Sequence, residues 1–195
     1  MDYIHRKNGA QGSHWIGDGT LEPSGGSCSR RSFTSYKVPV KALNIIWGND
    51  SRFWQREDLS DDDRKKIGFT ECAVLLQVNW MEVTAKFPLT MFKANRVPTK
   101  YEVVYHIKFR PGSFSWSSVP VKFKVRINET VSEKIVLLGP YSENPEVWHQ
   151  ISGGEFILPG ADEKSGAVVF GMFEVDSDKW KGGLVLGGVT IEPKS

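Results

Sequence analysis

Two runs in the middle of the chain alternate between apolar and polar residues, and this alternation restricts the fold more than any other feature. Residues 101–110 place aromatic or branched side chains at every odd position and mostly polar side chains at the even ones, and residues 119–127 repeat the pattern. A period of two residues is typical of strands with one buried and one solvated face. Because Pro111-Gly112-Ser113 and a serine-rich loop lie between the runs, the sequence predicts a hairpin with a long connection.

Short strands are also predicted along the rest of the chain beyond residue 42. Their expected ranges, most of them bordered by Gly, Pro, Asn or Asp, are 42–47, 74–87, 133–138, 155–158, 166–175 and 184–191. One helix is predicted over 58–67, because aspartates at 61–63 followed by basic residues at 64–66 complement a helix dipole. Serial short strands without a helical period between them indicate an all-β fold, an antiparallel β-sandwich of jelly-roll type.

The first 40 residues differ in composition from the rest of the chain. They are rich in glycine and serine and contain one notable apolar pair, Trp15-Ile16. Such a segment cannot bury enough apolar surface to order itself, so we expect a flexible extension over 1–40. Docking of Trp15 and Ile16 on the domain or on a partner is the alternative. Residues 41–195 are long enough for one folded domain with a sizeable core.

Charge and hydropathy exclude some classes of protein. The formal net charge of +2 is too small to direct the chain to nucleic acid or to an anionic membrane by itself. No apolar run approaches the ~20 residues needed to cross a bilayer, and no apolar stretch follows the charged N-terminus as in a secretory signal peptide. We therefore expect a cytosolic or nucleocytoplasmic protein that is not secreted through a signal peptide.

The two cysteines offer neither a disulfide framework nor the spacing of metal ligands. Cys72 opens an apolar run and is predicted to be a small buried hydrophobe. Cys28 lies in the predicted extension, close to Arg30 and Arg31, which favour its thiolate. It is therefore a candidate for an intermolecular disulfide. An unmodified surface thiol is the alternative.

Trp47 and Trp54 bracket a short polar turn that contains Asn49, Asp50 and Ser51. An aromatic ring offers a flat apolar face to a sugar or a base, and the amide, carboxylate and hydroxyl supply directional hydrogen bonds. This combination predicts a ligand site. The alternatives are a core position for Trp47 and plain turn formation by Asn49 and Asp50.

Three separated motifs occur in order over residues 42–193, namely residues 43–54, 78–83, and 180–184 followed by 191–193. Together they resemble the phloem protein 2 domain of plants, the family of the Nictaba-related lectins. The resemblance implies a sandwich-type lectin domain without enzymatic activity that binds N-acetylglucosamine oligomers and the cores of N-glycans. Members of this family occur in the nucleus and cytoplasm or in the sieve-element sap of the phloem.

The resemblance also implies roles for individual residues. The residues that match the binding site of the family are Trp47, Asn49, Asp50, Ser51, Trp54 and Glu174. A second acidic position of the family falls near Ala167 here. Because N-acetylglucosamine is neutral, such a site needs stacking area and hydrogen bonds but no metal or other cofactor. Single sugars bind weakly, so we expect a homodimer that gains avidity.

Other roles are weighed against this one. Trp80 is predicted to be a core residue, and Trp180 to close the sandwich edge rather than rim the site. RNA binding is the main alternative function, with Trp116 stacking a base beside one basic face formed if the two alternating runs pair. The basic residues of that face would be Lys108, Arg110, Lys122, Lys124 and Arg126. Glycoside hydrolysis is not expected, because the aspartates at 61–63 fit a helix start better than a catalytic carboxylate pair.

Overall fold

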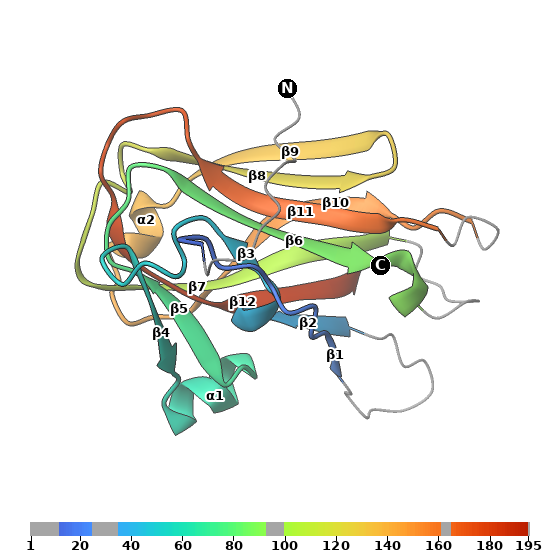
Figure 1. Cartoon of the computed structure of the whole chain (residues 1–195), viewed down its shortest axis with the longest axis horizontal. Helices are drawn as coiled ribbons and strands as arrows, with labels where there is room; N and C mark the ends of the chain where they lie inside the picture. The colour runs from blue at the N-terminus through green and yellow to red at the C-terminus, as the bar shows by residue number, and fades with distance from the viewer. Residues whose placement is uncertain (1–11, 25–34, 93–99, 161–164, 195) are drawn as a thin grey trace.

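The computed structural model describes residues 12–24, 35–92, 100–160 and 165–194, and these residues build two packed antiparallel sheets (Figure 1). The strands are β1 (Glu22–Ser24), β2 (Ser35–Pro39), β3 (Asn44–Ile45), β4 (Trp54–Asp58), β5 (Glu71–Leu75), β6 (Met81–Pro88), β7 (Lys100–Phe114), β8 (Pro120–Ile127), β9 (Thr130–Leu137), β10 (His149–Ile157), β11 (Ala167–Glu174) and β12 (Gly182–Lys194). The α-helices are α1 (Asp61–Ile67) and α2 (Gly139–Ser142), and the 3₁₀ helices are η1 (Val40–Ala42) and η2 (Leu89–Met91). Within the described ranges, every helix is too short to cross a bilayer.

The larger sheet is organised around β12, the long C-terminal strand. One edge of β12 pairs with β2 and β5, and its other edge pairs with β7. Farther out, β1 pairs with β2, β4 pairs with β5, and β10 pairs with β7. The smaller sheet has the order β3-β6-β11-β8-β9. All of these pairings are antiparallel. The predicted all-β sandwich is therefore confirmed.

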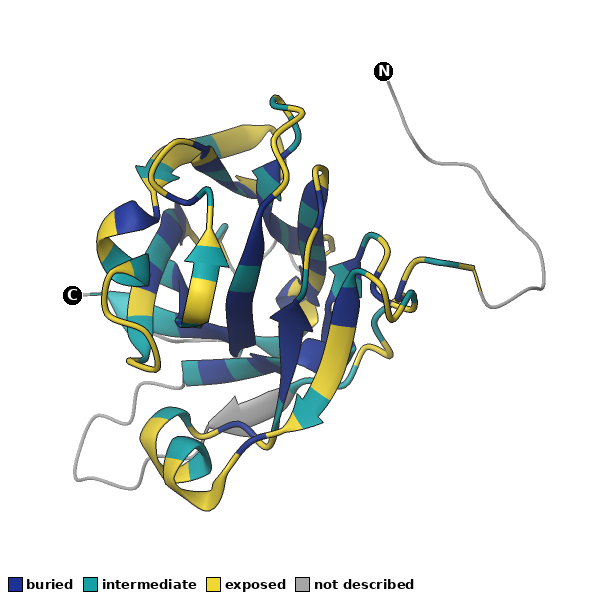
Figure 2. Ribbon diagram, turned by 90° about the vertical axis from the view of Figure 1, so that its left-hand side faces the viewer, coloured by how far each residue is buried: buried dark blue, intermediate teal, exposed yellow. Residues whose placement is uncertain are grey.

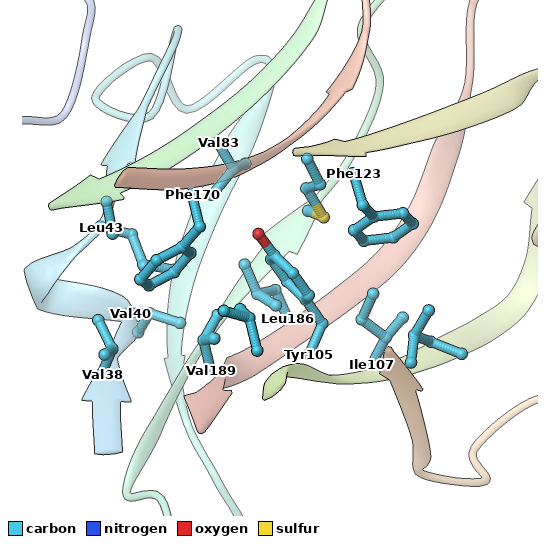
Figure 3. Packing of buried hydrophobic residues seen from close by; sticks show 14 of the residues in the cluster. Val38, Val40, Leu43, Val83, Tyr105, Ile107, Phe123, Phe170, Leu186 and Val189 are labelled. Carbon is cyan, nitrogen blue, oxygen red and sulfur yellow. The ribbon is translucent and has the colours of Figure 1, made fainter. Parts of the chain in front are cut away.

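The apolar faces of the two sheets meet in one core. Tyr105 of the larger sheet contacts Phe123 of the smaller sheet with ring centroids 5.0 Å apart, and Phe170 and Leu186 pack beside them (Figure 3). β6 and β8 bury every second side chain and leave the others partly or fully exposed (Figure 2). The two-residue period in the sequence is thus the period of strands that turn one face to this core.

The two alternating runs do not form the predicted hairpin. β7 lies in the larger sheet and β8 in the smaller one, so the connection between them crosses from one sheet to the other. Alternation requires only that each strand has one buried face, and two strands that face each other across a core satisfy it as well as two that pair. The hairpin prediction is wrong for this reason. The basic side chains on β7 and β8 consequently lie on opposite outer faces of the sandwich.

Two other predicted strands are shorter than expected. The predicted strand over 74–87 is divided, because β5 ends at Leu75 and β6 begins at Met81. Between them, Val78 forms an isolated bridge with Lys181. The predicted strand over 42–47 is reduced to the two residues of β3, since η1 precedes β3 and a turn follows it. Both interruptions place tryptophans in loops.

Two parts of the predicted extension lie against the sandwich instead. β2 pairs with β12 inside the larger sheet, so the folded domain begins before residue 41. Trp15 is buried and bridges to Ile45, and the guanidinium carbon of Arg56 lies 3.9 Å from the centroid of its ring. Ile16, by contrast, is exposed. One buried tryptophan and its backbone hydrogen bonds outweigh the glycine-rich composition of this segment.

α1 begins at Asp61, three residues later than predicted, because β4 and a short connection precede it. Its sequence signals act as expected. The Ser60 hydroxyl accepts a hydrogen bond from the Asp63 N–H, and Gly68 ends the helix in the left-handed region with φ of 73°. The helix prediction is confirmed apart from its first residues.

Cys72 is buried in a small apolar cluster against which Ile67 of α1 packs, as its predicted role requires. Burial raises the pKa of its thiol to about 11. This thiol is therefore unreactive in the folded protein near neutral pH. Cys28 lies outside the described residues.

Candidate binding site

Four aromatic side chains follow one another along the surface where the β3–β4 and β11–β12 loops meet. They form the aromatic strip, which consists of His14, Trp47, Phe53 and Trp180. Ring centroids are 5.1 Å apart from His14 to Trp47, 5.8 Å from Trp47 to Phe53 and 6.4 Å from Phe53 to Trp180. Trp47 is 37% exposed and Trp180 is 47% exposed. The strip therefore offers ring surface to a ligand, although the sequence brings it from three distant segments.

The backbone of Trp47 lies in the left-handed region, with φ of 62°. This conformation costs a bulky residue on the order of 1–3 kcal/mol. The Trp47 N–H donates to Nδ1 of His14 at 3.0 Å, and the Asn49 side-chain amide donates to the His14 carbonyl at 2.9 Å. Gly48 permits the close approach of this segment, because a Cβ there would lie 2.6 Å from Cβ of Trp15. The N-terminal segment thus holds the strained turn in place.

Trp180 is fixed by the loop between β7 and β8. The Ser115 hydroxyl donates to the Trp180 carbonyl at 2.6 Å, and the buried indole of Trp116 donates to the Gly182 carbonyl at 2.8 Å. Gly182 also lies against the Leu76 carbonyl, where a Cβ would be only 2.1 Å away. The segment that carries Trp180 is therefore held between two neighbouring loops.

Glu174 and Lys181 form an ion pair whose side chains are 1% and 0% exposed. The Lys181 ammonium also donates to the Asn79 carbonyl at 2.9 Å, and a backbone N–H of the β11–β12 loop donates to Glu174 at 3.2 Å. These hydrogen bonds and the mutual attraction offset the cost of removing both charges from water. The ion pair ties the loop that carries Trp180 to residues 76–80.

The polar residues of the predicted turn border a surface hollow of about 590 Å³. It is lined by Gly12, Ser13, Asn49, Asp50 and Ser51. The Arg52 guanidinium donates to the two oxygens of Asp50 at 3.0 and 2.7 Å. These hydrogen bonds lower the pKa of Asp50 to about 2. Asp50 is consequently ionised and already paired, with lone pairs left to accept from a ligand hydroxyl.

Trp54 does not join the other predicted stacking residue on the surface. It is 3% exposed, pairs with Leu75 across the larger sheet and packs in the main core. Its ring offers no face to a ligand, so direct stacking by Trp54 is incompatible with the structure. The sequence contained a signal for this, because Trp54 is followed by the polar run Gln55-Arg56-Glu57 and opens a strand of its own.

The predicted acidic partner is also absent from the surface. Glu174 is buried in its ion pair and has no face toward the aromatic strip from which to accept a sugar hydroxyl. Ala167 lies at the opposite end of β11, seven residues away, which is ~23 Å at the usual rise of a strand. A carboxylate at position 167 would therefore not reach the same site.

Trp80 and Trp180 are more exposed than predicted, each at 47%. The core prediction for Trp80 is wrong, because residues 76–80 leave the sheet and the regular alternation begins only at Met81. Trp180 belongs to the aromatic strip through its contact with Phe53 rather than closing the sandwich edge. The neighbouring polar and glycine residues, Asn79 before Trp80 and Gly182-Gly183 after Trp180, were the available signal of loop positions.

The basic face considered for RNA does not form among the described residues. Four of its five members pair with carboxylates: Lys108 with Asp63 and Glu146, Arg110 with Glu57, Lys122 with Asp176, and Lys124 with Glu133. Trp116, proposed to stack a base, is buried with its indole bonded to the backbone. A single basic face is absent because β7 and β8 lie in different sheets.

The family model described as phloem protein 2 matches residues 34–193 of this chain. The chain belongs to the phloem protein 2 family. The match begins at the start of β2 rather than at residue 41, and it contains Trp47, Phe53 and Trp180 of the aromatic strip. His14 and Trp15 lie before it. The resemblance based on three sequence motifs is therefore confirmed.

Three relatives from Arabidopsis thaliana illustrate the similarity within the phloem protein 2 family. Protein PHLOEM PROTEIN 2-LIKE A5 is 31% identical over 82% of this chain and 37% of its own length. Protein PHLOEM PROTEIN 2-LIKE A1 is 31% identical over 84% of this chain and 63% of its own length. Protein PHLOEM PROTEIN 2-LIKE A2 is 35% identical over 65% of this chain and 62% of its own length. The chain thus spans less than two thirds of the length of these relatives.

Proposed function

We propose that this phloem protein 2 domain is a lectin domain that binds N-acetylglucosamine oligomers, such as chito-oligosaccharides and N-glycan cores, without enzymatic activity. The observation that carries the proposal is the exposed aromatic strip next to a hollow lined by hydrogen-bonding groups. The resemblance to the Nictaba-related lectins supports the choice of sugar.

The chemistry of the strip suits a neutral sugar chain. The apolar faces of successive sugar rings would stack on Trp47, Phe53 and Trp180, whose centroids follow one another at 5.8 and 6.4 Å. Hydroxyl groups would donate to Asp50 and Ser51 at the hollow, and neither contact needs a metal or another charge. A row of rings favours an oligomer over a single sugar, because each further ring adds stacking area.

Trp54 and Glu174 act in this proposal as positioning residues rather than as ligand contacts. Trp54 packs in the core at the end of the loop that carries Trp47 and Phe53. Glu174 acts through Lys181, which anchors the backbone next to Trp180. Both therefore influence the strip through its geometry.

The affinity for one short oligomer is expected to be low. A few stacked rings and hydrogen bonds commonly leave about −4 to −5 kcal/mol, near millimolar dissociation. Two strips on a homodimer would raise avidity by roughly 10²–10⁴ for a multivalent glycan. We therefore keep the homodimer as part of the proposal, with an intermolecular disulfide through Cys28 as one way to form it. A cytoplasmic or phloem-sap setting is the matching location.

Glycan-array binding of the full chain, followed by calorimetry with chitotriose, tests the proposal. We expect retention on chito-oligosaccharide and N-glycan-core spots, with a dissociation constant near millimolar for free chitotriose. If no such glycan is retained while structured RNA binds at moderate salt, the proposed function is wrong.

A further inference from the structure

A second hollow lies on the outer face of the larger sheet and shares no residue with the aromatic strip. Its volume is about 380 Å³, within the roughly 300–1,000 Å³ usual for small-molecule sites. Its lining comes from the end of α1, from β7 and from the segment that enters β10. The residues of the lining are Lys66, Ile67, His106, Glu146, Val147, Trp148, His149 and Gln150.

His106 lies at the floor of this hollow, on the central strand β7. In the sheet it stands between Gln150 of β10 and Gly188 of β12. Gly187 and Gly188 lack side chains where α1 and the residues after it pack onto the sheet. A Cβ on Gly187 would lie 2.4 Å from Ile67, and one on Gly188 would lie 2.6 Å from the Phe69 ring. The glycines thus let apolar walls stand beside His106.

The hydrogen bonds of His106 define its tautomer. Its Nε2 lies 3.1 Å from the Thr190 hydroxyl, and that hydroxyl donates its single hydrogen to Glu192 at 2.7 Å. Nε2 must therefore be the donor. Burial lowers the pKa of His106, which favours the neutral ring. Nδ1 is then a bare acceptor, and it has no hydrogen-bond partner within the described parts of the chain.

Trp148, which lies beside Ile67 over Gly187, is held rigidly. The Trp148 indole donates to Asp63 at 2.7 Å, and the Lys108 ammonium donates to Asp63 at 3.0 Å and to Glu146 at 2.8 Å. Lys108 also lies 5.2 Å from the centroid of the Trp148 ring. These contacts fix the tryptophan and engage the Glu146 carboxylate, so the wall does not depend on a ligand for its position.

The charge of the lining indicates the kind of ligand. Lys66 is its one lysine, and Glu146 is its one carboxylate and is already bonded to Lys108. Burial favours the neutral form of His106, and His149 is the other histidine of the lining. Because the formal charges of Lys66 and Glu146 cancel, the lining does not select for an ion of either sign. Nδ1 of His106 has no protein partner among the described residues but keeps contact with solvent, so this acceptor favours a ligand that donates a hydrogen bond over one that cannot.

We propose that this hollow is a second binding site for a neutral ring compound that bears hydroxyl groups. A ligand hydroxyl donates to Nδ1 of His106, the apolar side of the ring rests against Ile67 and Trp148, and the Gln150 amide bonds the outer hydroxyls. Sugars and hydroxylated aromatic compounds share this chemistry. The site is separate from the aromatic strip and does not depend on the lectin function.

Protein-observed NMR on the full chain, with methyl β-glucoside and 4-hydroxybenzyl alcohol as probes, tests this site. We expect saturable shifts of the Trp148 indole N–H and of the His106 ring with one probe or both. The stronger probe indicates whether the natural ligand is a sugar or an aromatic compound. Absence of shifts at Trp148 with both probes at millimolar concentrations overturns the proposal.

A matched pair of variants tests the role of Nδ1. Asparagine places its side-chain oxygen close to the position of Nδ1 and so keeps the hydrogen-bond acceptor. Glutamine places its side-chain amide close to the position of Nε2 and so keeps only the donor to Thr190. We expect His106→Gln to weaken probe binding about tenfold and His106→Asn to retain most of it. Undiminished binding by a folded His106→Gln protein contradicts the proposal.

Two further variants keep the test decisive if the His106 variants are unstable. Gln150 is exposed, so Gln150→Leu should fold normally and weaken binding several-fold. Trp47→Ala removes a ring of the aromatic strip and should leave the shifts at Trp148 unchanged. If Trp47→Ala abolishes those shifts, the probes bind at the strip and the second site is refuted.

Discussion

The Lys181 ammonium pairs with the Glu174 carboxylate in the interior, at the junction between the loop that carries Trp180 and the segment that carries Trp80. Loops on a sandwich are usually mobile. Separation of this pair would leave a charge unpaired in an apolar environment, so the loops resist opening. A surface formed by loops can thereby keep the fixed geometry that stacking requires.

Loss of one partner of this pair should be more damaging than loss of both. Lys181→Met leaves Glu174 buried without its partner and should lower the free energy of unfolding by about 3–5 kcal/mol. The double variant Lys181→Met/Glu174→Leu should recover most of that loss, because no charge remains buried. Urea unfolding measures all three proteins.

The exposed ion pair between Lys122 and Asp176 supplies the control for this comparison. Lys122→Met should change the free energy of unfolding far less than Lys181→Met does, because solvent screens the pair. Equal losses in Lys181→Met and the double variant would show that packing, and not charge pairing, determines the contribution of Lys181.

The hydroxyl of Tyr105 is buried in the core without a hydrogen-bond partner within the described residues, and burial raises its pKa. Tyr105→Phe removes this unsatisfied group and should raise the free energy of unfolding by about 1–3 kcal/mol. Tyr105→Leu also removes the ring and should destabilise the protein instead. Thermal unfolding distinguishes them, and a lower Tm for the Phe variant would contradict the prediction.

His14 should affect sugar binding through the backbone of Trp47. His14→Phe keeps a ring but removes the acceptor of the Trp47 N–H. Loss of one hydrogen bond is worth about 0.5–1.5 kcal/mol, so the Kd for chitotriose should rise several-fold. His14→Asn keeps an acceptor close to Nδ1 and should bind more tightly than His14→Phe. Equal Kd values for wild type and His14→Phe would show that the Trp47 turn keeps its conformation without the hydrogen bond to His14.

The pH dependence of the polar turn follows from Asp50, whose pKa is lowered to about 2 by its hydrogen bonds with Arg52. Because the folded pKa lies below the ordinary value of 3.8, the stabilisation by this carboxylate is complete above 3.8 and is lost as the pH falls toward 2. An NMR titration of the Asp50 carboxyl carbon should give a midpoint of about 2.

Arg52→Gln provides the matched control, because it removes the guanidinium that lowers the pKa of Asp50. The midpoint should then move up toward 3.8. A wild-type midpoint already near 3.8 would show that the pair does not persist in solution.

The sequence predicts most of the strands, because alternation reports directly on a buried face. It does not predict which sheet a strand joins, since β7 and β8 satisfy their alternation by facing each other across the core at Tyr105 and Phe123. Docking of Trp15 on the domain was predicted only as the alternative to a flexible extension. That contact depends on one tryptophan and a set of backbone hydrogen bonds, which composition does not reveal.

The site was predicted only in part for a related reason. Residue type identifies a tryptophan near a polar turn but not the direction of its side chain. Trp47 is exposed, while Trp54, at the first position of β4, turns into the core. Trp180 joins the strip only because β11 and β12 place its loop beside Phe53. Such a contact between distant segments depends on the fold.

The central claim is that chito-oligosaccharides bind at the aromatic strip, and calorimetric titration of chitotriose tests it most directly. We predict that Trp47→Ala and Trp180→Ala each weaken binding about tenfold. The core variant Trp54→Phe keeps an aromatic ring that can still position the loop, so it should bind as wild type does. Undiminished binding by a folded Trp47→Ala/Trp180→Ala protein would contradict the claim.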